Sequence, residues 1–311
     1  MSKPKFDFAV GGQAVIEGVM MRSKNFIAVA VRKENGEIVT KDQKFQSLIQ
    51  KHKWLNIPLL RGVLNMFEMM VVGTRALNWS ADIFAEEDHV TKEDRENKSQ
   101  FWPNVLFAFN LVFSLALALF IFKFLPLGAT ELLNKVFPSI SENHFYYNFI
   151  DAVIKLTIFS LYIWGISFSK TIRRVFQYHG AEHKAVFNYE EDSELTVENS
   201  ARQSRFHPRC GTSFIIFVFL ISILIYMFIP RDPNFVINLA QRIAVLPLIA
   251  GVSYEILKAT AKNMDKVWVK AFTKPGLFFQ RLTTKEPDSA QLEVALVALK
   301  RTLELEQKYE G

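Results

Sequence analysis

The fold class is decided by one uncharged stretch of sequence, Val105-Leu-Phe-Ala-Phe-Asn-Leu-Val-Phe-Ser-Leu-Ala-Leu-Ala-Leu-Phe-Ile-Phe122. A helix needs roughly 20 mainly apolar residues to cross the hydrocarbon core of a bilayer, and the segment 102–125 around this stretch is long enough. A second segment, 212–229, is nearly all Phe, Ile, Leu and Val and ends at Pro230. Because 50% of the residues are hydrophobic and are unevenly distributed, the chain is predicted to be a multi-pass membrane protein rather than a soluble enzyme.

Two further segments, 147–169 and 235–256, are apolar but contain charges, and they bring the predicted number of spans to about four. Charged side chains inside a bilayer are costly unless they are paired, and they are often functional. Asp151 and Lys155 are one helical turn apart and can pair. Asp151 and Arg242 are therefore candidate functional residues. The simpler interpretation is that the charged side chains extend, or snorkel, toward the outer membrane surface. The alternative is that they form a path for a proton or an ion.

The orientation follows from the loops, because loops rich in Lys and Arg stay in the cytoplasm. From the N-terminus, the five segments outside the spans contain 15, 1, 7, 1 and 10 Lys and Arg residues. This alternation predicts that both termini and the central loop are cytoplasmic, and that 126–146 and 230–234 face outward. The first residues lack the apolar core of a cleaved signal, so the spans are expected to remain in the protein.

Cysteine content and charge exclude two other classes of protein. The single cysteine, Cys210, cannot form an intramolecular disulfide, which excludes a disulfide-stapled secreted domain. The net charge of +6 fits cytoplasmic loops beside anionic lipid. No basic run of the kind that binds nucleic acid is present, so no nucleic-acid partner is expected and the lipid bilayer is the predicted partner.

The N-terminal residues 1–50 are predicted to form a small cytoplasmic β-unit. Residues 26–32 and 37–40 flank Asn35-Gly36, and this pair favours the positive φ angles of a hairpin turn. Residues 14–16 and 19–21 are candidates for additional strands. In the next segment, 51–100, an amphipathic helix is expected over 55–79. This helix is expected to lie at the membrane interface or to pack on the domain rather than to form a fifth span. A charged linker is expected to follow it at 86–100.

The C-terminal cytoplasmic segment, 258–311, is predicted to end in a helix docked on the same domain. Asp288 and Gln291 have the spacing of a capping box, and leucines recur on one face after them, at positions 292, 296, 299 and 303. The predicted fold is therefore mainly α: a polytopic helical membrane protein with its first two spans within 101–170, its last two within 212–257, and a small cytoplasmic α+β domain.

The central loop, 171–211, contains Tyr178-His-Gly-Ala-Glu-His-Lys184. If the helix of the second span continues past Ser169, His179 and His183 lie one turn apart on one face and can bind the same metal ion. With Glu182 beside them, they form the H-x-x-E-H motif, the reverse of the zincin order, in which both histidines bind zinc and the glutamate accepts a proton from water. A helix-surface or buried polar role is the alternative.

A zinc site needs at least one more protein ligand, and His207 and Cys210 stand at a two-residue gap in the same loop. Four ligands would make a closed structural site, whereas three ligands with Glu182 free would make a catalytic one. The spare Glu182 favours catalysis. Further candidates for the third ligand, each of which also suits a solvated acidic turn, are Glu190, Glu191 and Glu194.

The N-terminal motif, Gly11-Gly-Gln-Ala-Val-Ile-Glu-Gly-Val-Met-Met-Arg22, lacks the glycine spacing and the Lys-Ser/Thr ending of a phosphate loop. Glu17 follows apolar residues, where burial would require a partner such as Arg22, a metal or a substrate cation. A surface glutamate in a strand and turn is the alternative.

Four motifs together resemble those of a bacterial multi-pass membrane family of unknown function, domain of unknown function 1385, whose members are described as predicted metal-dependent enzymes. They are Gly11–Arg22, Tyr178–Lys184, His207–Ser213 and Leu282–Asp288. The resemblance implies a bacterial inner-membrane protein and no particular substrate. The positions that it identifies as functional are His179, Glu182, His183, His207 and Cys210.

The expected function is therefore that of a metal-dependent hydrolase at the cytoplasmic face of the membrane. The predicted cofactor is a divalent ion, zinc first, and Glu182 is the predicted general base. The location alone suggests a lipid or membrane-peptide substrate. The alternative is a non-catalytic scaffold or transporter in which the metal is structural.

Overall fold

The computed structural model describes residues 10–85, 101–263 and 266–310. The chain divides into two compact units. Unit 1 combines Met1–Glu87, Ile166–Ile216 and Tyr254–Gly311, and unit 2 combines Asp88–Gly165 and Phe217–Ser253. The charged linker predicted at 86–100 lies outside the described residues.

Unit 1 contains a four-stranded antiparallel sheet with the order β1-β2-β3-β4. All of the strands predicted in the first 50 residues are confirmed, and their bounds are β1 (Gly11–Val15), β2 (Gly18–Arg22), β3 (Phe26–Arg32) and β4 (Ile38–Lys44). Because strands alternate their side chains between two faces, each strand contributes to two separate cores.

The turn between β3 and β4 differs in detail from the prediction. The N–H of Lys33 donates to the carbonyl of Glu37, and the N–H of Gly36 donates to Lys33. Within this turn, Gly36 has a positive φ of 87°, whereas Asn35 does not have a positive φ. The connection is thus a three-residue loop with glycine in the left-handed position, not a two-residue turn with two positive φ angles.

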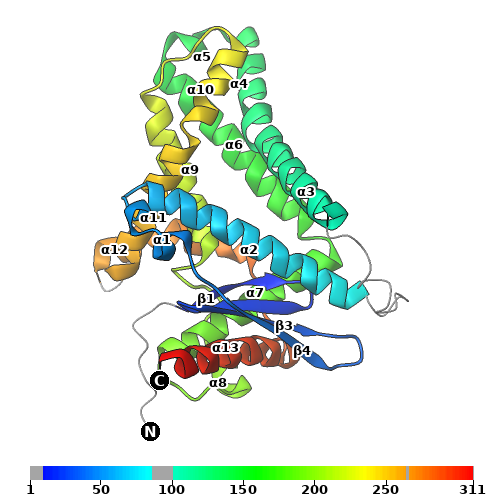
Figure 1. Cartoon of the computed structure of the whole chain (residues 1–311). Coiled ribbons are helices and arrows are strands. Elements are labelled where there is room, and N and C mark those ends of the chain that lie inside the picture. The colour runs from blue at the N-terminus through cyan, green and yellow to red at the C-terminus, as the bar shows by residue number, and fades with distance from the viewer. Residues whose placement is uncertain (1–9, 86–100, 264–265, 311) are drawn as a thin grey trace. The chain divides into compact units, whose positions relative to one another are not determined.

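The two faces of the sheet are covered by different helices (Figure 1). Val19 and Met21 face α7 (Lys170–Glu190) and α13 (Ser289–Glu310). The alternate residue Met20 packs in the second core, which Ala76 of α2 (Leu60–Ala85) joins. Unit 1 is therefore a three-layer arrangement in which α7, the helix that contains the H-x-x-E-H motif, lies directly against the sheet.

Helix α2 is the amphipathic helix that the sequence predicts, and it is packed on the domain. Its residues Met69, Val72 and Trp79 contact the sheet core. The predicted start near residue 55 is too early: residues 53–55 form the short 3₁₀ helix η1 (Lys53–Leu55), and α2 begins at Leu60.

Helix α13 has the capping box and apolar stripe predicted for it. The Asp288 carboxylate accepts from the N–H of Gln291 (2.8 Å), and the Gln291 side chain accepts from the N–H of Asp288 (3.0 Å). Leu292, Leu296 and Leu299 are buried against α7 and the sheet. Unit 1 also contains α1 (Leu48–Lys51), α8 (Val197–Ala201), α12 (Val267–Thr283), the beginning of α9 (Gly211–Met227) and the end of α11 (Leu246–Lys262).

Among the described residues, three helical segments are long and apolar enough to cross a membrane: Val105–Val136, His144–Ile166 and Phe235–Thr260. Helix α9, which corresponds to the third predicted span (212–229), is apolar but has only 17 residues. A 17-residue helix is at the lower limit of the length that spans a bilayer. These helices agree with a membrane protein.

The first of these segments extends further than the sequence predicts. Helix α3 (Phe101–Leu119) continues through the π-helical turn η3 (Phe120–Phe124) into α4 (Leu125–Val136). Proline has no N–H and clashes with the preceding helical turn, so a π turn just before Pro126 lets the helix continue past it. The predicted outward loop at 126–146 is therefore largely helical, and it also contains α5 (Ser139–Glu142).

The helix of the second predicted span does not run on into the motif. Helix α6 (His144–Ile166) ends three residues before Ser169, which is the N-cap of the separate helix α7. The fourth predicted span is also interrupted: α10 (Phe235–Ala244) and α11 (Leu246–Lys262) meet at Val245, next to Pro247. The two motif histidines nevertheless share one helix, because α7 contains both.

Three charges of unit 2 that the sequence places within predicted spans are buried inside the unit. Asp151, Lys155 and Arg242 are at most 4% exposed. Lys155 Nζ lies 3.0 Å and Arg242 Nη1 2.7 Å from the same oxygen, Asp151 Oδ2. Arg242 also donates to Asn148, and the ring of Tyr226 lies beside both cations. The pairing of Asp151 with Lys155 is confirmed, whereas snorkelling is wrong because both cations pair with Asp151 Oδ2 inside the unit.

Close backbone approach fixes the position of α7 against the segment that precedes α13. The N–H of Lys285 donates to the carbonyl of Phe176 (2.8 Å). A Cβ on Gly180 would lie 2.2 Å from the Lys285 carbonyl oxygen. Since real Cβ atoms do not approach an oxygen so closely, only glycine at position 180 allows this contact.

We predict that Gly180→Ala lowers the free energy of unfolding by about 1–3 kcal/mol, because overpacking displaces backbone that cannot move cheaply. The matched control is Gly165→Ala, another helical glycine, where nothing lies within 4 Å of the added Cβ and helix propensity alone favours alanine. Thermal unfolding in detergent, followed by circular dichroism, measures both. Equal stability of Gly180→Ala and the parent would contradict the rigid contact.

Candidate metal centre

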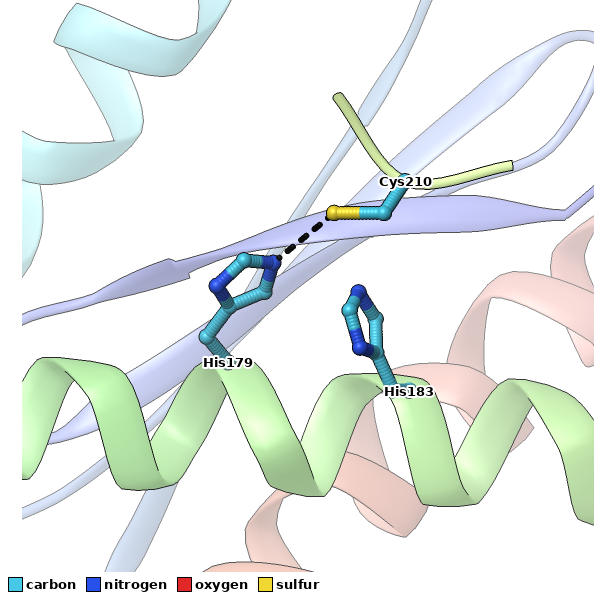
Figure 2. A group of neighbouring side chains, drawn as sticks. All are labelled: His179, His183 and Cys210. Carbon is cyan, nitrogen blue, oxygen red and sulfur yellow. Dashed lines mark hydrogen bonds between the residues drawn. The ribbon is translucent and has the colours of Figure 1, made fainter. Parts of the chain in front are cut away.

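Helix α7 presents His179 and His183 on one face, and both rings point toward Cys210 (Figure 2). The ring centroids of the two histidines are 4.5 Å apart, as expected for positions one helical turn apart. One ligand atom from each histidine and the sulfur of Cys210 lie within 4.8 Å of one another. Among the described residues, these three form the group of side chains that could hold a metal ion.

Two main-chain carbonyls determine which nitrogen of each imidazole is free. His179 Nδ1 lies 2.9 Å from the carbonyl oxygen of Thr283, and His183 Nδ1 lies 2.5 Å from that of Arg205. Because a carbonyl oxygen can only accept, each Nδ1 has the hydrogen, and each Nε2 has a lone pair. Metal-binding histidines typically have this arrangement, with the second ring nitrogen donating to a carbonyl or carboxylate.

The free nitrogens match the needs of an ion. His179 Nε2 lies 3.2 Å from Cys210 Sγ, and His183 Nε2 is buried without a hydrogen-bond partner. Burial lowers the pKa of His183, which favours the neutral imidazole that binds metal. Zinc accepts two nitrogens and a thiolate with bonds of about 2.0–2.3 Å, so its donors lie roughly 3.5 Å apart, and small rotations of these side chains suffice. The residues present therefore fit the ion.

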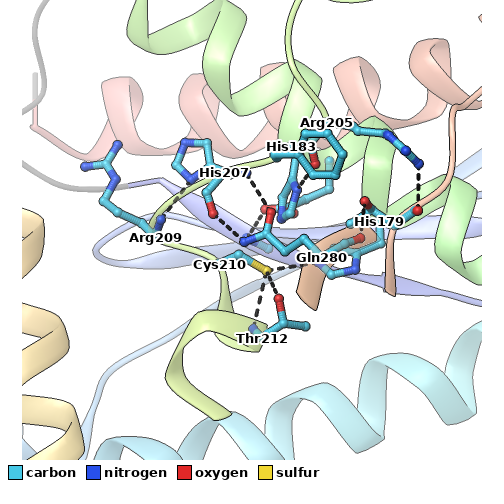
Figure 3. Close-up of polar contacts among 12 residues, drawn as sticks. His179, His183, Arg205, His207, Arg209, Cys210, Thr212 and Gln280 are labelled. Atoms are coloured by element: carbon cyan, nitrogen blue, oxygen red, sulfur yellow. Dashed lines mark hydrogen bonds and ion pairs between the residues drawn. The ribbon is translucent and has the colours of Figure 1, made fainter. Parts of the chain in front are cut away.

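Cys210 is positioned by a turn and by the start of α9 (Figure 3). The N–H of Cys210 donates to the carbonyl of His207 (3.2 Å), closing a β-turn that has Pro208 in its second position. The N–H of Thr212 donates to the sulfur (3.4 Å), and the Thr212 hydroxyl lies 3.2 Å from it. These polar groups, at the N-terminus of a helix, suit a sulfur with negative charge.

Gln280 of α12 holds this turn and was not anticipated from the sequence. Its side chain accepts from the N–H of His207 (2.8 Å) and donates to the His207 carbonyl (2.7 Å) and the Ser213 hydroxyl (3.2 Å). It is fully buried. No local signal identifies it, because Gln280 and His207 are far apart in the sequence.

His207 does not belong to the cluster, although the sequence made it an equal candidate with Cys210. Its Nδ1 accepts from the N–H of Arg209 (3.3 Å), and its Nε2 lies 3.4 Å from Glu190. Its ring is 5.8 Å from that of His183, and burial lowers its pKa. Both of its nitrogens therefore have protein partners, and the structure brings Cys210 rather than His207 to the two histidines of α7.

The acidic residues considered as further ligands also lie outside the cluster. Glu190 forms an ion pair with Arg209 in addition to its contact with His207. Glu191 accepts a hydrogen bond from Gln203 (2.7 Å). Glu194 uses its main-chain carbonyl to accept from Asn188. Among the described residues, none of these three glutamates joins the group of side chains that could hold an ion, and the carboxylate that lies beside His183 is that of Glu182.

Glu182 is 6% exposed and is held by the edge of the sheet. Its Oε1 accepts from the N–H of Gly12 (2.9 Å), and its Oε2 lies 3.5 Å from His183 Nε2. Burial raises the pKa of Glu182 above its ordinary value. A Cβ on Gly12 would lie 2.1 Å from the Met20 carbonyl oxygen and 3.2 Å from Glu182 Cγ, so glycine is needed at position 12.

The partner of Glu17 is neither a metal nor Arg22. Glu17 stands in the tight turn between β1 and β2 with a φ of 49°, and its carboxylate accepts two hydrogen bonds from Arg174. The Tyr178 hydroxyl adds a third (3.3 Å). Glu17 therefore attaches the first half of α7 to the sheet. The guanidinium of Arg22 lies elsewhere, 4.2 Å from the ring centroid of Phe45.

The cluster opens into a cavity of about 770 Å³ beside β1. The cavity is lined by the three candidate ligands and Glu182, and by apolar side chains that include Val175, Phe176 and Ile215. A volume of this size accommodates a small-molecule substrate or a segment of a larger one.

The arrangement defines a candidate metal centre in a protein with membrane-type helices, and the comparisons place the chain in a family. The model of the family "Protein of unknown function (DUF1385)" matches residues 57–305, so the chain belongs to that family. Its similar relatives include the "Uncharacterized protein YqhQ" of Bacillus subtilis (strain 168), 37% identical over 314 residues, which cover 98% of this chain and 96% of the relative. No solved structure matches the chain.

We predict that Gln280→Leu exposes Cys210. The change leaves the buried N–H of His207 without a partner, which costs about 1–3 kcal/mol. It also removes one of the two donors to the His207 carbonyl, which keeps only the N–H of Cys210, and so loosens the turn. Cys210 is the one cysteine of the chain and is 8% exposed, so the rate of its reaction with a thiol reagent reports on the turn directly. The rate should rise in Gln280→Leu and stay unchanged in the control Gln203→Leu, and a parental rate in both would contradict the role of Gln280.

Proposed function

We propose that the protein binds one divalent ion, zinc first, through His179 Nε2, His183 Nε2 and Cys210 Sγ, and that it is a membrane-bound hydrolase. One observation supports this above the others. Both imidazoles donate Nδ1–H to main-chain carbonyls, so their free nitrogens converge with a thiol at one end of a cavity. This arrangement costs free energy unless a ligand binds the Nε2 lone pairs, because His183 Nε2 is buried without a hydrogen-bond partner.

Glu182 is the residue of this chain that would transfer the proton. A bound zinc ion would lower the pKa of water toward ~7. In hydrolysis the water oxygen bonds to the acyl or phosphoryl centre, the bond to the leaving group breaks, and the proton removed from the water ends on the leaving group. Glu182 can accept and return that proton because burial raises its pKa, and Gly12 holds its carboxylate in place.

The membrane arrangement that we propose has four spans, with both termini and the central loop in the cytoplasm of a bacterial cell. It includes the three longer segments and, as the third span in chain order, the shorter helix α9. The alternation of Lys and Arg in the loops supports the orientation. Cys210 directly precedes α9, so this proposal puts the metal centre near the cytoplasmic face and favours a lipid or membrane-peptide substrate.

A non-catalytic protein with a structural metal is the second candidate. The buried cluster of Asp151, Lys155 and Arg242 in unit 2 favours its transporter form, because charges inside membrane segments often mark ion paths. In that case Glu182→Gln has no effect on function, and Asp151→Asn abolishes ion flux in proteoliposomes.

Metal content tests the centre itself. We predict that the purified parent contains about one equivalent of zinc by elemental analysis, and that His183→Ala loses it, because removing one of three protein ligands leaves only two. His52→Ala, a histidine of unit 1 outside the cluster, is the matched control and should retain the metal. A parent without metal after growth in zinc-supplemented medium would reject the centre.

Turnover tests the hydrolase. We predict that Glu182→Gln retains the metal but hydrolyses its substrate at least 100-fold more slowly, as expected for loss of a general base. The protein in nanodiscs is incubated with bacterial lipid extract and with membrane peptides, and products are identified by mass spectrometry. Equal product formation by the parent and Glu182→Gln would exclude the role of Glu182.

A further inference from the structure

The charges around the cavity are unbalanced in favour of cations. Besides the candidate metal ligands, Arg22, Lys24 and Arg209 line it. The one carboxylate among its described lining residues is Glu182, which already accepts from Gly12. With a divalent ion in place the excess would be larger, so the cavity suits a ligand that brings negative charge.

Of these three cations, Arg22 is the one that is partly buried and has no ion pair among the described residues. The other two differ from it: Lys24 is exposed, and Arg209 is paired with Glu190. Arg22 is partly buried and forms no ion pair with the part of the chain that the structure describes; its contacts are the ring of Phe45 and the sulfur of Met69. Burying a guanidinium without an ion-pair partner costs free energy, which suggests that an anionic ligand pairs with Arg22.

The charge of Glu68 acts on Arg22, but the Glu68 carboxylate is engaged elsewhere and forms no ion pair with Arg22. Glu68 lies on α2, the helix that Arg22 faces, and its carboxylate accepts from the Ser47 hydroxyl (2.6 Å) and from the N–H of Leu48 (2.5 Å). Stacking on Phe45 fixes the guanidinium without using its hydrogen-bond donors. Arginine presents these donors as a planar fork that matches phosphate and carboxylate oxygens.

The position of Arg22 relates it to the metal centre through the register of the sheet. Arg22 is paired with Gly11, and the next pair, Gly12 with Met21, includes the glycine that holds Glu182. β1 is the edge strand, so side chains from both faces of the sheet reach a cavity beside it. Nothing lies within 4 Å of the position where Gly11 would have a Cβ, which leaves open space next to Arg22.

Much of the remaining wall is apolar. Val10, Met69, Val175, Phe176 and Ile215 line the cavity and would contact hydrocarbon. Other parts of it are lined by the neutral polar side chains of Gln13, Ser23, Gln50 and Thr212. A largely apolar wall with a fixed guanidinium and one reactive centre suits an amphiphile with an acidic head. A protein with membrane-type helices would meet such molecules in its own bilayer.

We infer that Arg22 binds the phosphate of an anionic phospholipid in this cavity, so that the substrate class of the proposed hydrolase is an acidic lipid. That the lipid is hydrolysed rests on the proposed function. That the lipid is acidic rests on the guanidinium of Arg22, which has no ion pair among the described residues. Arg22 acts in binding, and its loss should raise KM much more than it lowers kcat.

The experiment measures binding to the full-length, zinc-loaded protein in detergent. The probes are short-chain phosphatidic acid, short-chain phosphatidylcholine, inorganic phosphate and an acidic peptide, each titrated by calorimetry. We expect phosphatidic acid to bind at least 10-fold more tightly than the other three. Arg22→Gln should remove this preference by weakening phosphatidic acid at least 10-fold, and Arg22→Lys should retain part of it because the charge remains.

Two controls separate failure of this inference from failure of the proposed function. Arg301→Gln, which removes an exposed cation outside the cavity, should bind as the parent does. Zinc content and the thiol reactivity of Cys210 are measured in every variant, and Arg22→Gln should be unchanged in both. One result would reject the role of Arg22 and leave the proposed hydrolase intact. In that result the parent contains zinc and Glu182→Gln loses turnover, while Arg22→Gln binds phosphatidic acid with the parental affinity.

Preferred binding of another probe would also overturn the acidic-lipid assignment. Inorganic phosphate binding as tightly as phosphatidic acid would indicate a site for the free ion. Tighter binding of the acidic peptide would indicate a peptide substrate. Equal affinity for phosphatidylcholine would show that the hydrocarbon alone is recognised.

Discussion

The candidate site depends on two hydrogen bonds from imidazole N–H groups to main-chain carbonyls. Thr283 and Arg205 supply the carbonyls, from the segment that ends α12 and from the loop before His207. A main-chain acceptor cannot rotate away or change its protonation, so each ring keeps the same tautomer and direction. Two histidines one turn apart on an exposed helix would instead sample several rotamers, and binding an ion would require their ordering. Here that ordering is part of the fold.

The carbonyls can reach the histidines only because the backbone packs closely around α7. Gly180 lets the Lys285 segment lie against the helix, and that segment begins directly after Thr283. Gly12 does the same on the sheet side, where its N–H holds Glu182. The four motifs that distinguish the sequence therefore meet around one helix. Each contributes an anchor or a ligand, which explains why residues so far apart in the chain belong to one site.

Local patterns in the sequence predicted what depends on local geometry. The pairing of His179 with His183 follows from helical periodicity, and the capping box at Asp288 and the strands of the first 50 residues follow from similarly short-range rules. The sequence could not decide between His207 and Cys210, because the decision depends on Gln280, which lies far along the chain and fixes both sides of His207. The snorkelling assigned to Asp151 was wrong for the same reason, since its partner Arg242 is on another helix.

The two tasks of the proposed enzyme are divided between different parts of unit 1. The three donors to the ion come from α7 and from the residue before α9, all within the residues that the family model matches. Gly12 and Arg22, which hold the proton acceptor and line the cavity, belong to strands that precede residue 57, where that match begins. Without the sheet, Glu182 would lose its anchor, the cavity would lose one wall, and α7 would lose the core that it shares with Val19 and Met21. In the proposed enzyme the sheet would therefore position the proton acceptor and one side of the substrate cavity, while α7 and the residue before α9 would hold the ion.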